Sequence, residues 1–153
     1  MKLWRVTRAV HAALDGAGAI EHGGRYSPPG LPVVHFASEA ALAVLIALRY
    51  QPADPAQAER DLVLGWIEVS EQPERVPAVL DEAAIRVWVN SWLTERRSMV
   101  AALPSRVLPE GDVLLFNPRH PAAAQVGALQ TRPFSFAECL HTPPMRALYG
   151  ATP

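Results

Sequence analysis

Short apolar runs separated by proline- and glycine-containing connections make up most of the chain. Several of these runs are rich in β-branched and aromatic residues and end at turn-forming residues, a pattern typical of strands. The run "LVLGWIEVS" contains Gly65, which indicates a β-bulge. The pattern predicts strands at residues 3–7, 31–37, 62–70, 98–109, 112–121 and 126–136.

Two further segments have the pattern of helices. Residues 39–50, "EAALAVLIALRY", are apolar almost all round, so we expect this helix to be largely buried. Ser38 is suited to cap its N-terminus, and Glu39 to interact favourably with the helix dipole. Residues 81–97 predict a second helix. Strands and helices together predict an α+β fold with short strands and one buried helix.

Length, charge and cysteine content narrow the class of protein. The 153 residues fit one domain, which we assign to residues 1–140, followed by a C-terminal tail at 141–153. The net charge of −1 argues against a general binder of nucleic acids or membrane surfaces. Cys139 is the only cysteine, and no apolar stretch reaches membrane-spanning length. We therefore expect a soluble, cytoplasmic protein.

The segment "HGGRYSPPGLPVVHF", residues 22–36, contains the first candidates for chemistry. Arg25 follows two glycines, which allow a ligand to approach the backbone closely, and an arginine can bind an anion through two parallel hydrogen bonds. The alternative is a surface arginine in an ordinary loop. His35 lies in an apolar strand, where a histidine is more often a core residue than a catalytic one.

Two later segments place polar residues beside prolines. Ser105 follows Pro104 and is suited either to present its hydroxyl to a ligand or to cap a turn. In "NPRHP", Asn117 and His120 are held between prolines, which suits either a binding site or a rigid connection. Neither the histidines nor the single cysteine have the spacing of metal ligands, so we expect no metal site.

Taken together, these segments resemble the RES domain family, the toxin half of a bacterial toxin–antitoxin pair. The resemblance runs in one order through "LWRVTR", "GGRYSPPGLPVVHFAS", "ALAVLIAL", "LPSRVLPEGDVLLFNPRHP" and "PFSF", and covers nearly the whole chain. The arginine of the family's G-R-[WY] motif falls on Arg25, and the serine of its [VL]-P-S motif on Ser105. The family's N-P-x-H-P motif matches residues 117–121 in full.

The sequence departs from the family pattern at functional positions. His35 stands where the family usually has tyrosine, and the helix glutamate and histidine of the family fall on Ile46 and Tyr50. Glu39 lies seven residues before Ile46, two helical turns away on the same face. We hypothesise that Glu39 replaces the missing carboxylate, in which case Glu39→Gln should abolish activity.

The resemblance implies NAD+ as the substrate and a fold like that of the ADP-ribosyltransferases and diphtheria-type toxins, with small mixed or antiparallel sheets. Cleavage of the nicotinamide–ribose bond builds positive charge on the ribose, which a carboxylate stabilises. The resemblance implies that Arg25 contacts phosphate or ribose and that Tyr26 and His35 contact nicotinamide or its ribose. Ser105 is implied to bind ribose or the carboxamide. Asn117 and His120 are implied to support the side of the site that Ser105 forms.

Three functions are compatible with the resemblance. The first is mono-ADP-ribosylation of a cellular protein. We favour it because the family's glutamate is absent, and a transferase, unlike a hydrolase, takes its nucleophile from the target protein. One branch of the family modifies phosphoribosyl pyrophosphate synthetase. The second is hydrolysis or phosphorolysis of NAD+. The third is a degenerate, non-enzymatic binding module. The implied partners are a Xre-like helix-turn-helix antitoxin that covers the active site, a target protein, and a second copy in a homodimer.

Overall fold

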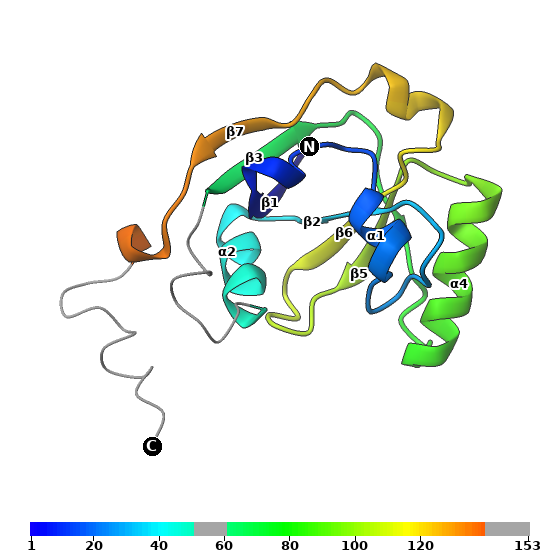
Figure 1. The fold of residues 1–153 in the computed structure, drawn as a ribbon. Coiled ribbons are helices and arrows are strands. Elements are labelled where there is room, and N and C mark those ends of the chain that lie inside the picture. Colours follow the sequence, from blue (N-terminus) through cyan, green and yellow to red (C-terminus); the bar gives the residue numbers. More distant parts are fainter. Residues whose placement is uncertain (51–60, 140–153) are drawn as a thin grey trace.

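The computed structural model describes residues 1–50 and 61–139 of the protein (Figure 1). The strands are β1 (Lys2–Arg8), β2 (Val34–Ala37), β3 (Leu62–Glu68), β4 (Glu74–Arg75), β5 (Val100–Pro104), β6 (Asp112–Phe116) and β7 (Gln130–Pro133). The α-helices are α1 (Ala17–His22), α2 (Ala40–Arg49) and α4 (Glu82–Glu95), and the 3₁₀ helices are η1 (Ala9–His11), η2 (Pro121–Gln125) and η3 (Phe136–Cys139).

All the strands pair in one seven-stranded sheet, in the order β4-β5-β6-β2-β1-β3-β7. Among the described strands only β4 and β5 form a parallel pair, so the sheet is mixed. The predicted α+β class is confirmed, but a single sheet replaces the expected small sheets. Individual strands can be predicted from the alternation of apolar and polar residues along a short segment. Which strands pair with one another depends on tertiary packing between segments far apart in sequence.

The two faces of the sheet carry different layers. On one face Leu3, Phe36 and Phe116 belong to a core that the segment around η2 covers. On the other face α4 packs on β5 and β6, with Trp92 fully buried, and α2 packs near β1 and β2 (Figure 1). The two long helices therefore lie at different ends of the same face.

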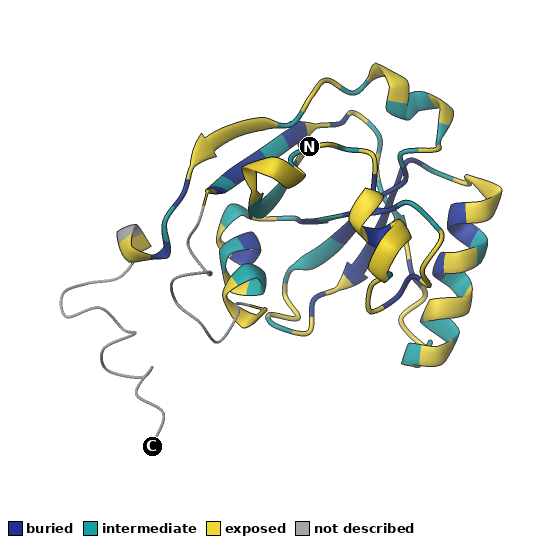
Figure 2. Ribbon diagram, in the orientation of Figure 1, coloured by how far each residue is buried: buried dark blue, intermediate teal, exposed yellow. Residues whose placement is uncertain are grey.

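The prediction that the helix at residues 39–50 is largely buried is wrong. Within α2 only Leu42 and Ala43 are buried, whereas Leu45 and Leu48 are 41% and 47% exposed (Figure 2). The helix rests on the sheet along one side only. Apolar composition shows what a helix can bury, but neighbouring elements decide how much of it is covered.

Two local predictions also need correction. Gly65 pairs in regular register with Arg5, so β3 has no bulge there. A Cβ on this glycine would come within 2.6 Å of a Leu129 methyl carbon, so close packing explains the glycine. The N-cap of α2 is Glu39, without a side-chain cap, while the Ser38 hydroxyl accepts a hydrogen bond from the backbone N–H of Asp112 at 3.0 Å.

The sheet is nearly divided between β1 and β2. These strands form a single residue pair, Trp4 with Ala37, whereas β1 pairs with β3 along its whole length. The backbones of Arg5 and His35 are therefore not bridged by the ladder, and a gap opens between the strands. The predicted tail at 141–153 lies outside the described residues. Within the described residues, no helix combines the length and apolar character needed to span a membrane.

Candidate active site

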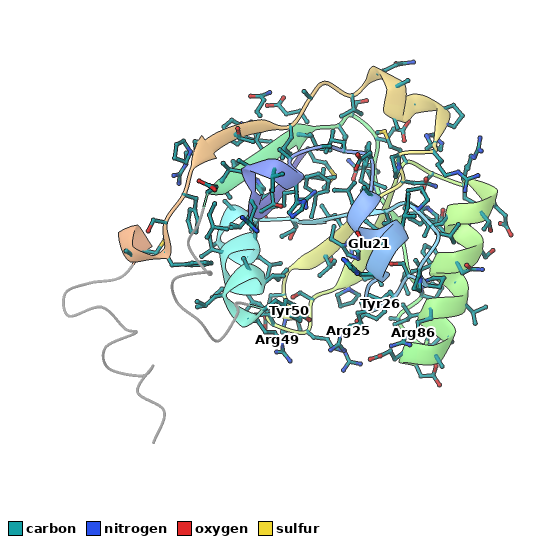
Figure 3. The ribbon with its side chains drawn as sticks, viewed as in Figure 1. Glu21, Arg25, Tyr26, Arg49, Tyr50 and Arg86 are labelled. Carbon is teal, nitrogen blue, oxygen red and sulfur yellow. The ribbon has the colours of Figure 1, made fainter. Side chains whose placement is uncertain are left out.

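A cavity of about 400 Å³ occupies the gap between β1 and β2. Its wall is formed by β1, the loop after α1, β2, α2 and the connection from β5 to β6. Figure 3 shows Arg25, Tyr26, Arg49 and Tyr50 grouped along one edge of the molecule, where α2 and the loop after α1 approach each other. The polar and aromatic lining residues are Trp4, Arg5, Arg25, Tyr26, His35, Phe36, Arg49, Tyr50, Ser105 and Arg106.

The loop that carries Arg25 is held by its glycines. Gly23 has a φ of 67°, in the left-handed region that favours glycine, and its backbone N–H donates to Ala19 at the end of α1. The backbone N–H of Gly24 donates to the carbonyl of Ser27 at 2.9 Å, which closes a tight turn around Arg25. The turn fixes the backbone on both sides of the arginine.

The Arg25 side chain interacts with elements distant in sequence. Its Nη1 lies 3.2 Å from Oε2 of Glu82 on α4. A hydrogen bond with Tyr50, and secondly the charge of Glu82, raise the pKa of Arg25. Glu82 also pairs with Arg106 at 2.8 Å and with Arg86 at 3.1 Å. The carboxylate of Glu82 therefore ties two cavity arginines, Arg25 and Arg106, to the first turn of α4.

His35 projects from β2 into the cavity as a neutral imidazole. Burial, and secondly the positive charge of Arg5, lower its pKa to about 4. A Cβ at Gly24 would lie 3.0 Å from Cε1 of His35, so the glycine lets the loop pass close to the ring. His35 is only partly buried and lines the cavity, so the structure places it at the cavity wall rather than in the closed core.

Arg5 is one of the cavity residues that sequence reasoning missed, with Arg49 and Arg106. Its guanidinium donates to the Thr7 hydroxyl at 3.3 Å and lies 5.8 Å from the centre of the Phe36 ring. Burial lowers its pKa, and the charge of Asp15 opposes this effect. Among the described residues Arg5 has no salt bridge. A partly buried guanidinium without a paired carboxylate is suited to bind an anionic ligand.

The sequence offered one indication that Arg5 is functional, namely that it is a charged residue within the apolar strand "LWRVT". It was ambiguous because strand residues alternate between faces, and an arginine at that position could equally face solvent. Only the gap between β1 and β2 brings this position into contact with the cavity.

Ser105 lines the cavity and also caps a turn. Its side chain is buried, and its hydroxyl oxygen accepts hydrogen bonds from the backbone N–H groups of Val107 at 3.1 Å and Leu108 at 3.4 Å. The hydroxyl proton can still donate to a ligand. Both interpretations of this residue are therefore compatible with the geometry.

The structure does not bring the motif "NPRHP" to this cavity. Asn117 is fully buried, donates to the carbonyl of Leu93 at 3.3 Å, and accepts from the backbone N–H of Arg119 at 3.0 Å. His120 accepts from the backbone N–H of Ala122 at the start of η2 and lines a separate hollow. These contacts match the rigid-connection interpretation, since both side chains bond to backbone groups.

The structure also separates Glu39 from the cavity. Glu39 is exposed at the N-terminus of α2 and does not line the cavity, whereas Ile46 and Tyr50, further along the helix, do. The geometric basis for Glu39 as a replacement carboxylate is therefore absent. Two turns of helix keep residues on one face but separate them by about 10 Å along the axis. No group of metal-ligating residues is found within residues 1–50 and 61–139.

Comparisons with known proteins show the family of this chain. The RES domain family matches residues 2–137. The protein named Toxin Res from Pseudomonas putida is 31% identical over 143 residues, covering 88% of this chain and 96% of the relative. The Prs ADP-ribosylating toxin of a Sphingobium species is 34% identical over 131 residues, covering 78% of this chain and 81% of the relative.

A solved structure has the same fold. The crystal structure of the M. tuberculosis MbcT–MbcA toxin–antitoxin complex contains a chain that matches with a TM-score of 0.68 at 20% identity. The match covers 88% of this chain and 84% of that chain. The family match extends over both strands that border the cavity and over the loop of Arg25. This chain therefore belongs to the RES domain family.

Proposed function

We propose that this protein is a toxin that uses NAD+ to mono-ADP-ribosylate a cellular protein and so arrests growth. The observation that carries the proposal is the convergence of Arg5, Arg25, His35 and Ser105 on one cavity. A RES relative at 34% identity is named as an ADP-ribosylating toxin, which supports the transferase branch. By analogy with the name of that relative, the target we propose is phosphoribosyl pyrophosphate synthetase.

The chemistry of the cavity suits the parts of NAD+. The pyrophosphate carries two negative charges, and Arg5 and Arg25 offer guanidinium groups that bind phosphate oxygens through two parallel bonds. The Tyr26 and neutral His35 rings offer surfaces and hydrogen bonds for the nicotinamide and its ribose. The Ser105 hydroxyl proton is available for the ribose or the carboxamide.

In the proposed reaction the bond between nicotinamide and ribose C1′ breaks, and positive charge develops on the ribose. The side chain at the position of the family's glutamate is that of Ile46, which lines the cavity. A hydrolase must activate a water molecule, whereas a transferase receives its nucleophile from the target protein. The isoleucine therefore favours transfer over hydrolysis.

We further propose that a cognate antitoxin covers this cavity, since the structurally similar chain belongs to a toxin–antitoxin complex. A Xre-like helix-turn-helix protein is the partner that the family resemblance implies. A homodimer is proposed on the same resemblance. Binding of an antitoxin over the mouth would exclude both NAD+ and the target.

Two other functions remain as alternatives. An enzyme that degrades NAD+ by hydrolysis or phosphorolysis would use the same cavity, and the four lining arginines would suit binding of inorganic phosphate. A degenerate module would bind an antitoxin without converting NAD+. The observation that supports it is that Ile46 replaces the family's glutamate.

The test is incubation of the purified chain with NAD+ labelled in its ADP-ribose part and a bacterial extract, with free nicotinamide measured in parallel. A labelled protein band that Arg25→Ala removes would support the transferase. Nicotinamide release without labelled protein would show NAD+ degradation instead. Neither signal, together with no growth arrest on expression without antitoxin, would leave the binding module.

A further inference from the structure

We infer that the side chain that accepts ADP-ribose on the target protein is a carboxylate, of aspartate or glutamate. This inference rests on the proposed transferase function and specifies its second substrate. It is carried by two features of the cavity: the arginines at its mouth and the isoleucine at its wall.

Arginines are concentrated at the mouth although the chain as a whole carries a net charge of −1. Arg25, Arg49 and Arg106 all line the cavity and are all exposed to solvent, and Figure 3 shows Arg25 and Arg49 at the same edge. Arg5 adds a fourth guanidinium deeper in the cavity. Four positive charges exceed the two negative charges of a pyrophosphate, so the mouth can bind a further anion.

Glu82 reduces this positive charge but does not supply a reactive group. Its Oε2 lies 3.2 Å from Arg25 and 2.8 Å from Arg106, and its Oε1 lies 3.1 Å from Arg86. Both oxygens of this carboxylate are therefore engaged by guanidinium groups. Glu82 itself does not line the cavity.

The described part of the cavity wall also favours an acceptor that needs no deprotonation. No aspartate or glutamate is among the lining residues that the structure describes, and Ile46 stands at the position of the family's glutamate. His35 is a poor base, because its pKa of about 4 means that it releases protons readily. Serine, lysine and arginine acceptors must lose a proton when the new bond forms, whereas a carboxylate is already ionised at neutral pH.

The step balances without a general base. A carboxylate oxygen of the target forms a bond to C1′ of the nicotinamide ribose. The bond from C1′ to the pyridinium nitrogen breaks, its electron pair remains on that nitrogen, and nicotinamide leaves as a neutral molecule. The product is an ester between the target's carboxyl group and ADP-ribose, and no proton is transferred. Arginines at the mouth would bind the other carboxylate oxygen and orient the attack.

The chemical stability of the link tests the inference. Protein labelled by the purified full chain, from labelled NAD+ and a bacterial extract, is treated with neutral hydroxylamine, which cleaves such esters. We expect loss of the label, with aspartate or glutamate as the modified residue by mass spectrometry. A serine-linked ADP-ribosyl standard should keep its label. Label that resists hydroxylamine would overturn the inference and leave the transferase function intact, whereas absence of any labelled protein would contradict the transferase function itself.

A pair of variants gives an independent test. Ile46→Glu returns a carboxylate to the cavity wall, and Ile46→Gln is its uncharged match of similar shape. We expect Ile46→Glu, but not Ile46→Gln, to raise the ratio of free nicotinamide to labelled protein, because a base in the cavity activates water as a competing nucleophile. Equal ratios in the two variants would contradict the argument that the missing carboxylate selects the acceptor.

Discussion

Two loops of this protein both combine an arginine with prolines but have different roles. The loop at residues 23–30, "GGRYSPPG", and the loop at residues 117–121, "NPRHP", both follow a regular element and hold polar residues beside prolines. In the first, Arg25 bonds to Glu82 on α4 and to Tyr50, the C-cap of α2, and lines the cavity. In the second, Asn117 bonds to backbone groups and is fully buried.

The difference is in the partners of the polar groups. A polar side chain whose hydrogen bonds are all made to backbone groups stabilises the fold, because those groups would otherwise be buried without partners. A guanidinium that shares one carboxylate with another arginine at the edge of a cavity keeps donors available for a ligand. Rigid sequence alone does not separate the two cases, whereas the identity of the partners does.

The largest expected effect is on activity. Arg25→Ala should lower kcat/KM for NAD+ by about 100- to 1,000-fold, since it removes a fixed cationic donor from the cavity. Arg119→Ala is the matched change in the other loop, at an exposed arginine, and should keep wild-type activity. Release of nicotinamide measures both. Equal losses in the two variants would remove the functional distinction between the loops.

The next effect is a pH dependence of stability that arises at the cavity. The pKa of His35 is about 4 in the folded protein and about 6.5 in an unfolded chain. Between these values the unfolded chain binds a proton that the folded chain does not, so the free energy of unfolding falls as the pH falls from 6.5 to 4. The loss amounts to about 3 kcal/mol at most.

Denaturant unfolding at a series of pH values measures this effect. His35→Gln removes the titrating group, so the variant should lose less stability than the wild type over that range. A His35→Gln variant with the wild-type pH profile would show that other groups cause the acid sensitivity.

A smaller effect is expected in the second loop, and on stability rather than activity. Asn117→Ala should lower the free energy of unfolding by about 2 kcal/mol, because the carbonyl of Leu93 and the N–H of Arg119 lose their partner. Asn90→Ala, at an exposed position of α4, is the matched control and should change little. Activity per folded molecule should remain. A loss of turnover in folded Asn117→Ala would return this loop to the active site.

The smallest effect concerns the cap of η2. His120→Ala should cost about 1 kcal/mol or less, since its ring nitrogen accepts from the backbone N–H of Ala122. His120→Asn, which retains an acceptor at the cap, should recover most of the loss. Thermal unfolding of the three proteins gives the comparison. If both variants are equally destabilised, the turn is stabilised by packing of the imidazole ring and not by its hydrogen bond at the cap.

The local sequence was sufficient to predict several individual elements and two of the cavity residues. The strand at residues 3–7 was expected from alternation and is observed as β1, and the helix at residues 81–97 is observed as α4. In that helix the Asp81 side chain caps the N-terminus by accepting from the N–H of Ala84 at 2.8 Å. The family motif singled out Arg25 and Ser105, and both line the cavity. Such features depend on residues close together in the chain, so their pattern is visible without the fold.

Only the tertiary structure decided which residues meet. The single pair between β1 and β2 opens the gap that exposes Arg5 to the cavity, and no local pattern encodes where two strands diverge. The ion pair of Arg25 with Glu82 joins residues 57 positions apart in the chain. The same applies to Asn117, whose role follows from its contact with Leu93 on α4. The sequence determined the chemical groups that the protein possesses, and long-range packing decided which of them share a site, because packing energies depend on neighbours that the local sequence does not contain.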